Sequence, residues 1–202
     1  MLIKTLEVGH LDTNCYVVSD EDTLLCAVID PGAESNTIMN YLEENRLKCA
    51  DVMLTHAHFD HVGAVDALLE ETGAQLHMCE KELQLPPMMT GGWRPPEGVK
   101  YYAEGDTVEV GGLTFTVLET PGHTPGGVSL LCGDALFTGD TLFRGSCGRA
   151  DFDGADIMQE FESLKKLSEL PGDYDVYPGH DLSTTLGRER ACNPYMQRAV
   201  QM

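Results

Sequence analysis

The sequence predicts an α/β fold made of two strand-rich halves with helices between them. Short apolar runs with the composition of β-strands recur along the chain, amphipathic segments with helical spacing lie between them, and Gly/Pro-rich loops separate them. At 202 residues the chain could form one large domain or two small ones, and a hydrophobic content of 42% is enough for a sizeable core.

The N-terminal half begins with three strand-like runs, the last two joined across a polar turn, as is typical of an antiparallel meander. Asp30-Pro31-Gly32 ends the third run, and we expect Ser35 to cap the helix that follows. The expected elements are strands at Ile3 to Val8, Asn14 to Ser19 and Leu24 to Ile29, a helix from Ser35 to about Asn45, a strand at Asp51 to Thr55, a helix from Val62 to Thr72 closed by Gly73, and a strand at Gln75 to Met78.

Residues 83–106 change character, because prolines and glycines crowd around Met88, Met89 and the only tryptophan, Trp93. A loop of this length is uncommon unless it is functional or mobile, so a lid over a substrate and a surface excursion both stay open. Beyond it we expect hairpins at Val108 to Leu118 and Gly127 to Thr138, a helix from about Ala155 to Leu167, a strand at Tyr174 to Tyr177 and a short helix near Leu186 to Ala191.

The stretch T-H-A-H-F-D-H, Thr55 to His61, gathers three imidazoles and a carboxylate between a predicted strand and a predicted helix. Neutral imidazole nitrogens and carboxylates are ligands of divalent zinc, iron and manganese. Residues two apart in an extended loop point to the same side. We therefore expect His56 and His58 to hold one ion, while Asp60 and His61, turned by the helix start, face a second.

Three further metal-type residues also follow apolar runs directly. His123 stands in T-P-G-H-T-P-G-G, Asp140 in T-G-D and His180 in P-G-H, so that five of the 7 histidines lie in loops after strands. Rigid strands with ligands on their exit loops provide the preorganisation that a metal site needs. His77 alternates with apolar neighbours and is expected to be structural, whereas Asp30 is either a partner of a ligand histidine or a plain turn residue.

Composition disfavours several other functions. The formal net charge of −20 would repel nucleic acid and anionic membranes. The N-terminus lacks the apolar core of a signal peptide, and no run approaches the ~18 apolar residues of a membrane helix. The 7 cysteines are odd in number and form no C-x-x-C pair, which suggests reduced thiols and a cytoplasmic location.

Together, H-x-H-x-D-H at residues 56–61, G-H at His123, G-D at Asp140 and P-G-H at His180 resemble the metallo-β-lactamase superfamily. The resemblance implies a four-layer αβ/βα sandwich of two mixed β-sheets flanked by helices, formed by residues 1–202 as one domain. Within that superfamily, G-D-T-L-F-R-G-S-C-G-R-A-D-F and E-R-A-C-N-P are similar to the short glyoxalase II-like hydrolases, also called hydroxyacylglutathione hydrolase-like. Only 22 residues follow His180, so the separate C-terminal glutathione-binding domain of two-domain glyoxalase II is not expected.

The resemblance also assigns residues to roles. It implies that one metal is held by His56, His58 and His123, a second by Asp60, His61 and His180, and that Asp140 bridges both. Arg149 would anchor an anionic or amide group of the substrate, unless it pairs with Asp151 or Asp153 on the surface. His61 and Asp140 argue against the antibiotic-cleaving zinc β-lactamases, and His58 argues against the diiron flavoproteins.

The function implied is metal-dependent hydrolysis of a thioester, S-lactoylglutathione or a similar small acyl thiol. Two divalent ions, zinc first with iron or manganese as alternatives, would lower the pKa of a shared water so that a metal-bound hydroxide attacks the carbonyl while Asp60 orients it. The alternative is a mononuclear iron persulfide dioxygenase that uses His56, His123 and Asp140. The expected partner is a small molecule, and the sequence leaves the oligomeric state open.

Overall fold

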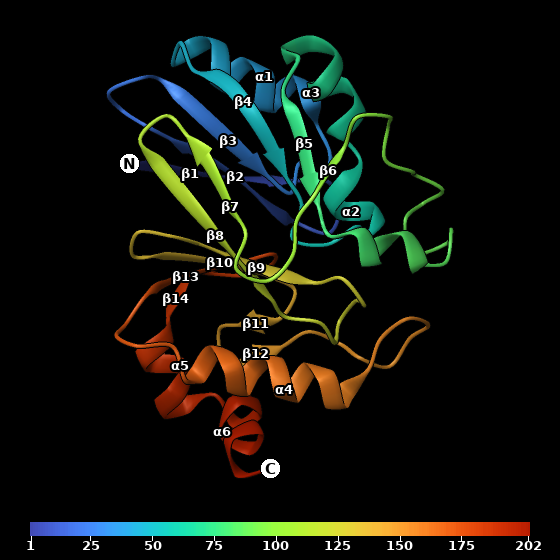
Figure 1. Ribbon diagram of the computed structural model, residues 1–202, viewed down its shortest axis with the longest axis vertical. Helices are drawn as coiled ribbons and strands as arrows, with labels where there is room; N and C mark the ends of the chain where they lie inside the picture. Colours follow the sequence, from blue (N-terminus) through green and yellow to red (C-terminus); the bar gives the residue numbers. More distant parts are fainter.

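Two six-stranded sheets pack face to face, and helices cover the outer side of each (Figure 1). The structure, a computed structural model, describes all 202 residues. The first sheet has the order β1 (Leu2–Val8), β2 (Thr13–Ser19), β3 (Leu25–Ile29), β4 (Lys48–Met53), β5 (Gln75–Met78) and β6 (Lys100–Tyr101). The second has the order β14 (Thr184–Thr185), β13 (Asp175–Pro178), β10 (Ala135–Gly139), β9 (Val128–Cys132), β8 (Leu113–Glu119) and β7 (Thr107–Val110).

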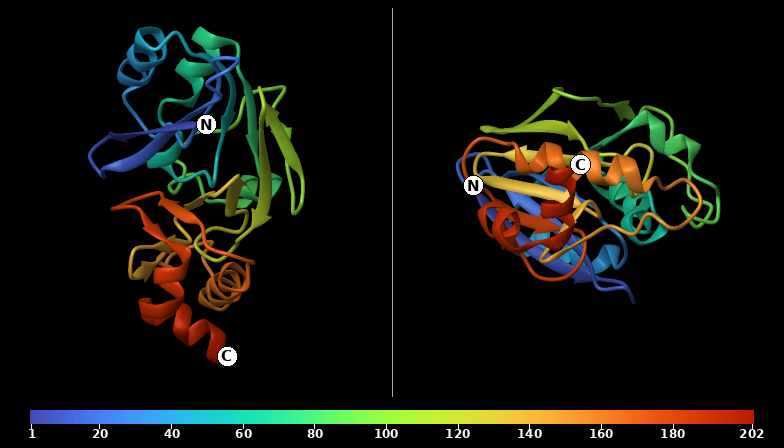
Figure 2. Two further views of the ribbon diagram at one scale, coloured as in Figure 1. Left: turned by 90° about the vertical axis from the view of Figure 1, so that its left-hand side faces the viewer. Right: turned by 90° about the horizontal axis from the view of Figure 1, so that it is seen from below.

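The remaining elements are helices and one small hairpin. α1 (Ser35–Glu44) and α3 (Val65–Thr72) lie on the first sheet, and α4 (Ile157–Ser168), α5 (Leu186–Cys192) and α6 (Pro194–Gln201) lie on the far side of the second (Figures 1 and 2). The short helix α2 (Phe59–Val62) and the 3-10 helix η1 (Glu80–Gln84) are near the junction of the two halves. The hairpin β11 (Leu142–Phe143) with β12 (Ser146–Cys147) lies between the second sheet and α4 (Figure 1).

Both sheets are mixed. In the first, β1, β2 and β3 are antiparallel, and β3, β4, β5 and β6 run parallel to one another. In the second, β7 to β10 form an antiparallel meander, and β13 pairs in parallel with β10. The expected α/β sandwich of two mixed sheets flanked by helices is therefore confirmed.

Three buried clusters correspond to the three contacts between the four layers. Side chains alternate across a strand, so Val17 of β2 packs under α1 and α3 while its neighbour Val18 packs between the sheets. Phe137 of β10 also lies between the sheets, and its neighbour Leu136 packs against α4 and α6. Each fully buried side chain of this size contributes roughly 1.5–3 kcal/mol, which fixes the sheets and hence the loops at their ends.

Several expected details are wrong. The helix expected from Val62 to Thr72 is broken, because the N–H of Ala64 donates to Pro31 O at 2.9 Å instead of to the preceding turn. The residue before α1 that occupies the cap position is Glu34 in a left-handed conformation, and Ser35 is already helical. The glycine-rich loop after Asp140 contains the β11–β12 hairpin, and α6 follows the expected C-terminal helix.

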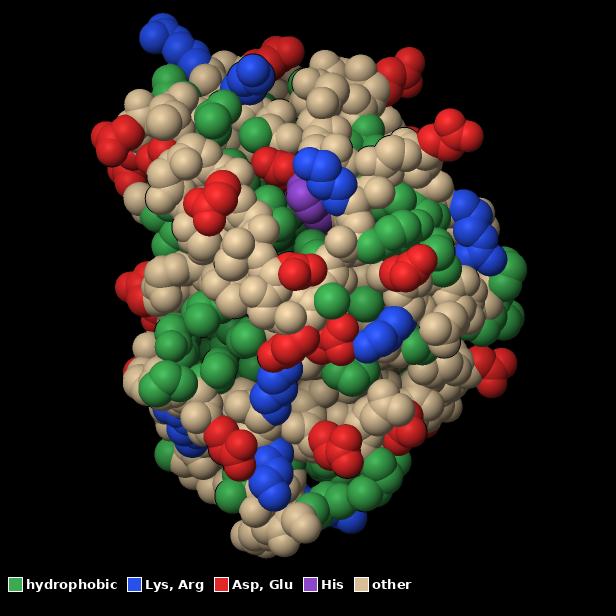
Figure 3. Space-filling model, viewed as in Figure 1, with side chains coloured by type: hydrophobic (Ala, Val, Ile, Leu, Met, Phe, Trp, Pro, Cys, Tyr) green, Lys and Arg blue, Asp and Glu red, His purple; other side chains and the backbone are tan.

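Charge is spread over the molecule without a large basic area on the face in Figure 3, where Asp and Glu side chains alternate with Lys and Arg. No helix in the structure is both long enough and apolar enough to cross a membrane.

Candidate metal centre

Four strand ends bring the sequence-predicted metal residues together between the two sheets. The loop after β4 carries residues 56–61, and β8, β10 and β13 are followed by His123, Asp140 and His180. Three groups have potential ligand atoms within 4.8 Å of one another. Two of them are His56, His58 and His123, called here the histidine trio, and Asp60, His61 and His180, called here the mixed trio. The third is Asp30, His56 and His61. The histidine trio and the mixed trio are the two ligand sets that the family resemblance implied.

Distances inside the trios are those of atoms that face a common point. Nδ1 of His58 lies 3.0 Å from Nε2 of His123. In the mixed trio, Nε2 of His180 lies 3.2 Å from Oδ2 of Asp60 and 3.4 Å from Nε2 of His61. Tetrahedral zinc with bonds of about 2.0–2.1 Å separates its ligand atoms by roughly 3.3 Å, so both trios have a spacing that a metal ion fits.

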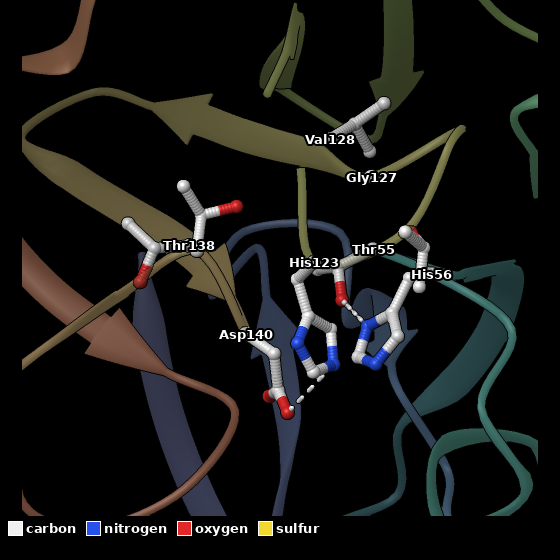
Figure 4. Close-up of a pocket in the computed structure, with 9 residues that line it drawn as sticks. Thr55, His56, His123, Gly127, Val128, Thr138 and Asp140 are labelled. Carbon is white, nitrogen blue, oxygen red and sulfur yellow. Dashed lines mark hydrogen bonds and ion pairs between the residues drawn. The ribbon is translucent and has the colours of Figure 1, made fainter. Parts of the chain in front are cut away.

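Asp140 lies between the trios. Its Oδ2 is 3.4 Å from Nε2 of His123, and its Oδ1 is 3.5 Å from Nε2 of His61. Figure 4 shows Asp140 and the rings of His56 and His123 turned toward one another from three separate loops. One carboxylate therefore faces both groups of nitrogens, which is the arrangement that a bridging ligand requires.

Hydrogen bonds on the outer side of the rings aim the inner nitrogens. Nδ1 of His123 lies 2.8 Å from Arg149 O, and Nδ1 of His180 lies 3.1 Å from Leu11 O. A carbonyl only accepts, so each Nδ1 must carry the proton and each Nε2 presents a lone pair to the centre. Such outer partners fix the tautomer of metal-binding histidines.

Asp30 is the outer hydrogen-bond partner that orients His61. Its Oδ2 lies 3.1 Å from Nδ1 of His61 and accepts the hydroxyl of Thr55 at 2.5 Å, while Oδ1 accepts the Thr55 N–H at 2.7 Å. The Thr55 hydroxyl oxygen in turn lies 3.1 Å from Nδ1 of His56 (Figure 4). Of the two interpretations of Asp30, the structure supports a partner of ligand histidines.

Three buried atoms of the ligand-type residues have no hydrogen-bond partner: Nε2 of His56, Nε2 of His58 and Oδ1 of Asp140. Buried polar atoms in folded proteins are almost always paired, and each exception calls for an explanation. Nε2 of His56 and Oδ1 of Asp140 face the space between the ligand-type groups, where a cation would satisfy them (Figure 4). The residues present therefore fit a metal.

The two trios differ in their electrostatics. Burial lowers the pKa of His58 to about 3 and that of His56 well below its ordinary value, so both are neutral near pH 7, the form that binds metal. Burial also lowers the pKa of His61, but Asp140 and Asp30 outweigh it and raise that pKa to about 9. The carboxylates around the mixed trio therefore favour positive charge at this position.

Glu82 joins two of the loops that carry ligand-type residues, and it was not predicted from the sequence. This residue on η1 is 1% exposed, and its Oε2 accepts the N–H of Ala57 at 2.6 Å while its Oε1 accepts that of Gly126 at 2.7 Å. Burial raises the pKa of Glu82, and these backbone hydrogen bonds oppose the rise. A buried acidic side chain next to a proline-rich loop has no motif that could have revealed this contact.

A second unpredicted carboxylate lies on α4. Oε2 of Glu160 accepts the N–H of His123 at 2.9 Å, and burial raises the pKa of Glu160 to about 9. Glu160 therefore holds the backbone of His123, while Glu82 joins the loop of Ala57 to the turn of Gly126.

A cavity of about 430 Å³ opens onto the centre. Its volume is in the range of small-molecule sites. Its walls combine ligand-type residues with an apolar rim: His58, Asp60, His123, Asp140 and His180, then Leu11, Phe59, Met89, Phe143 and Phe152, with Arg149 at the edge.

Of the other residues singled out in the sequence, Arg149 lines the cavity, whereas Trp93 and His77 do not. Arg149 borders the cavity, but its guanidinium pairs with Asp151 at 2.9 Å and lies 6.0 Å from the centre of the Phe152 ring. Trp93 points to α3 and donates to Asp66 at 3.1 Å, so residues 83–106 reach the cavity through Met89 and not through Trp93. His77 pairs with Asp51 at 2.8 Å outside the centre, as a structural histidine.

Comparison with curated proteins gives relatives that match almost end to end. Hydroxyacylglutathione hydrolase GloC of Haemophilus influenzae is 31% identical, with 97% of this chain and 98% of that protein covered. The probable metallo-hydrolase YqgX of Bacillus subtilis is 34% identical, with 96% of each covered.

Solved structures agree. The BLEG-1 B3 metallo-β-lactamase superposes with a TM-score of 0.87 at 32% identity, covering 96% of this chain and 99% of that one. ETHE1 from Myxococcus xanthus superposes with a TM-score of 0.84 at 34% identity, covering 96% of this chain and 84% of that one. TTHA1623 in a di-iron-bound form superposes with a TM-score of 0.83 at 37% identity, covering 95% of this chain and 99% of that one. The model of the metallo-β-lactamase superfamily matches residues 8–180, from the first strand to the last histidine of the centre. The chain belongs to the metallo-β-lactamase superfamily.

Proposed function

We propose that this protein is a metal-dependent hydrolase that cleaves the thioester of a small acyl thiol such as S-lactoylglutathione. The observation that carries the proposal is the position of Asp140, whose carboxylate faces the histidine trio at 3.4 Å and the mixed trio at 3.5 Å. Two complete ligand sets that share one carboxylate fit a pair of divalent ions.

The proposed ligands are His56, His58 and His123 for one ion and Asp60, His61 and His180 for the other, with Asp140 between them. When bound, two such ions lower the pKa of a water toward neutrality and polarise a carbonyl oxygen. The nitrogen-rich ligand set suits zinc first, and iron or manganese are alternatives. The di-iron form of TTHA1623, 37% identical, keeps iron in consideration.

The chain's own groups then position the reactants. Asp60 accepts a hydrogen bond from the hydroxyl of Thr13 at 3.2 Å and lines the cavity, where its carboxylate can orient a water and hold its proton. The cavity is lined by no serine, threonine or cysteine, so none of these side chains can supply a nucleophile there. A departing thiolate is stable near neutral pH and requires little help from an acid.

The apolar rim and Arg149 supply substrate contacts in this proposal. Phe59, Phe143 and Phe152 surround the opening and exclude water from the acyl group. Arg149 would contact an anionic or amide group of the substrate, in exchange for its exposed pair with Asp151. We propose a small-molecule partner, because the net charge of −20 repels nucleic acid and anionic membranes and the face in Figure 3 has no large basic patch.

The likeness to GloC, whose name states hydroxyacylglutathione hydrolysis, supports the thioester. The test is metal analysis of the purified protein together with a substrate panel of S-lactoylglutathione, a β-lactam and glutathione persulfide. We expect two metal ions per chain and hydrolysis of the thioester without oxygen uptake. A β-lactam belongs in the panel because BLEG-1 is 32% identical.

The alternative is a mononuclear iron persulfide dioxygenase with His56, His123 and Asp140 as ligands. The contact between His123 and Asp140 and the likeness to ETHE1 give it some support. In this alternative, the mixed trio of Asp60, His61 and His180 would hold no metal ion. Oxygen consumption with glutathione persulfide and one iron per chain would overturn the hydrolase.

A further inference from the structure

The segment Thr13–Tyr16, T-N-C-Y at the start of β2, contacts both parts of the chain that carry the mixed trio. It belongs to the first sheet, and all four of its side chains are buried. Asp60 lies on α2, which follows β4 of the first sheet, whereas His180 follows β13 of the second sheet. The geometry of the mixed trio therefore depends on how these two parts are held together.

The two faces of β2 reach different parts of the mixed trio, because side chains alternate across a strand. Tyr16 packs between the two sheets, and Asn14, two residues before it, lies on the same face. Thr13 lies on the opposite face, where its hydroxyl donates to Oδ2 of Asp60 at 3.2 Å. One face of the strand thus holds a ligand carboxylate, and the other is turned toward the second sheet.

Asn14 holds the loop of His180 by its backbone. The side-chain nitrogen of Asn14 donates to Pro178 O at 3.0 Å and to Asp181 O at 2.9 Å. Its backbone N–H donates to Gly179 O at 2.8 Å. These three hydrogen bonds enclose the histidine, since two of the acceptors precede it in the chain and one follows it.

Tyr16 adds a second donor to the same loop. Its hydroxyl donates to Pro178 O at 2.5 Å, and a carbonyl oxygen has two lone pairs, so it can accept from both Tyr16 and Asn14. Just before the segment, Leu11 O accepts from Nδ1 of His180 at 3.1 Å. The stretch that holds this loop therefore also orients the imidazole ring.

The histidine trio has a different connector. None of the hydrogen bonds made by the side chains of Thr13, Asn14 and Tyr16 reaches His56, His58 or His123. The loops of the histidine trio are joined instead by Glu82 of η1, through two backbone N–H groups. Each trio is thus held across the two sheets by its own set of contacts.

We propose that Thr13, Asn14 and Tyr16, called here the β2 clamp, are positioning residues for the ion of the mixed trio and control its binding independently of the ion of the histidine trio. They would act through Asp60 and His180 without contacting the ion. The inference rests on the two-ion centre of the proposed function. A protein with a weakened clamp would keep one ion and lose the other.

A purely structural role for the segment predicts a different result. Both trios combine residues from loops of both sheets, so weakening a segment that only joined the sheets would disturb both trios. The melting temperature would then fall and both ions would bind more weakly. A loss of affinity confined to one ion distinguishes positioning from general support.

The first test titrates the metal-free protein with Co²⁺, with native mass spectrometry to count the ions and visible absorption to follow their binding. Wild type should bind two ions. Thr13→Val, which keeps the shape and removes the hydroxyl, should bind one ion as wild type does and the other about 10-fold more weakly, within the range for outer partners of ligands. Equal weakening of both ions, or wild-type affinity for both, would overturn the proposal.

Two further variants control this experiment. Thr13→Ser restores the hydroxyl and should restore the affinity for the second ion. Ser19→Ala removes another buried hydroxyl at the far end of β2, which donates to Leu2 O at 3.4 Å, and it should bind both ions as wild type does. A loss in Ser19→Ala as large as in Thr13→Val would show that any buried hydroxyl of this strand has the same effect and would refute the clamp.

The identity of the affected ion is tested in a His180→Ala background, which lacks one ligand of the mixed trio. Adding Thr13→Val to this variant should leave the affinity for the remaining ion unchanged, because the clamp has no contact with the histidine trio. A further loss of affinity would show that the clamp also acts on the first ion, which would overturn its independence.

Tyr16→Phe tests the hold on the loop without any metal. In the metal-free protein the N–H of Gly179, which donates to Gly139 O at 2.8 Å, should exchange with solvent about fivefold faster in Tyr16→Phe than in wild type, the order of one lost neutral hydrogen bond. The same N–H should exchange at the wild-type rate in Ser19→Ala. Equal exchange in Tyr16→Phe and wild type would show that the clamp does not hold this loop.

Cobalt binding needs no substrate, and this separates the inference from the proposed function. Two ions with a second affinity that depends on Thr13, but no hydrolysis of S-lactoylglutathione, would leave the clamp intact and refute the thioesterase. Hydrolysis together with equal affinities in wild type and Thr13→Val would refute the clamp and leave the thioesterase. Binding of a single ion by wild type would overturn both.

Discussion

Glu82 and Ala57 are joined by a 2.6 Å hydrogen bond from the backbone N–H between the first two histidines of the motif to a fully buried carboxylate. The other oxygen of Glu82 accepts the N–H of Gly126, three residues after His123, at 2.7 Å. One side chain therefore sets the spacing between the loop of His56 and His58 and the turn of His123. The histidine trio depends on an anion that lies outside it.

We expect Glu82→Gln to weaken metal binding at the histidine trio by about 10-fold or more, within the range found for outer partners of ligands. The amide keeps the shape but has one acceptor oxygen, so one of the two backbone N–H groups would face an NH₂. Metal affinity should be measured by competition with a chromogenic chelator, together with kcat for the thioester.

Glu160→Gln is the matched control for that change. Glu160 is also buried and uses one oxygen to accept the N–H of His123. Because its raised pKa of about 9 keeps it protonated at neutral pH, an amide replaces it with little change. Equal losses of metal affinity in both variants would contradict the prediction, because the loss would then not depend on the two hydrogen bonds that Glu82 accepts from Ala57 and Gly126.

A second prediction concerns Asp30. Asp30→Asn replaces one of the two oxygens that receive the Thr55 N–H, the Thr55 hydroxyl and the proton on Nδ1 of His61. We expect kcat to fall about 10- to 100-fold, since the tautomer of His61 is no longer fixed. Asp51→Asn breaks the Asp51–His77 pair outside the centre, and it should lower stability while kcat stays near wild type. A similar fall in kcat for both would refute the specific role of Asp30.

The sequence predicted features that are marked by neighbouring residues in the chain, and it did not predict contacts between residues far apart in the chain. His56 to His61, His123, Asp140 and His180 follow apolar strands directly, and the strand ends do converge in the fold. Glu82 and Glu160 act on backbone groups 25 to 44 residues away, and no pattern in the chain marks such contacts.

Other misses had a local signal. Asn193 accepts the N–H groups of Tyr195 and Met196 and is followed by Pro194, the cap and first-residue pair of a helix start, so α6 could have been expected. The break between α2 and α3 could not, because it results from the hydrogen bond of Ala64 N–H to Pro31 O, and Gly63 packs so closely on this turn that a β-carbon would lie 2.3 Å from Gly32 O. Packing of the Asp30-Pro31-Gly32 turn overrode helix propensity there.

A third prediction tests the mixed trio. His61→Ala should reduce the metal content from two ions to one per chain and lower kcat by at least 100-fold, if hydrolysis needs both ions. Mass spectrometry of the native protein and elemental analysis give the count. His77→Ala, which removes a buried histidine outside the centre, should retain two ions. Unchanged activity in His61→Ala would show that the second ion is not catalytic.

A fourth prediction concerns the contribution of Glu189 to the pH dependence of stability. Burial by itself raises the pKa of this carboxyl, but hydrogen bonds from Thr184, Gly145 and Asn193 outweigh it and lower the pKa below its ordinary value near 4.5. A lowered folded-state pKa contributes stability that is present above the unfolded value and is lost as the pH falls through the folded one. The melting temperature of wild type should therefore exceed that of Glu189→Gln at pH 7, and this advantage should shrink below about pH 4.5. A difference that stays constant from pH 7 to pH 3 would contradict the assignment.

The last prediction concerns Gly32, where a β-carbon would lie 1.6 Å from the carbonyl oxygen of Asp60. Gly32→Ala must push the start of α2 away, which we expect to lower the melting temperature by roughly 5–10 °C, as for an overpacked site in a domain of this size. Because Asp60 moves with that backbone, kcat should fall as well. Gly73→Ala is the comparison: it places a side chain at φ +68° with nothing within 4 Å, so backbone strain of about 1 kcal/mol should lower the melting temperature by only ~2–4 °C and leave kcat unchanged. Calorimetry and kinetics on both variants measure the contrast, and a Gly32→Ala protein as active as Gly73→Ala would show that the contact with Asp60 does not position the mixed trio.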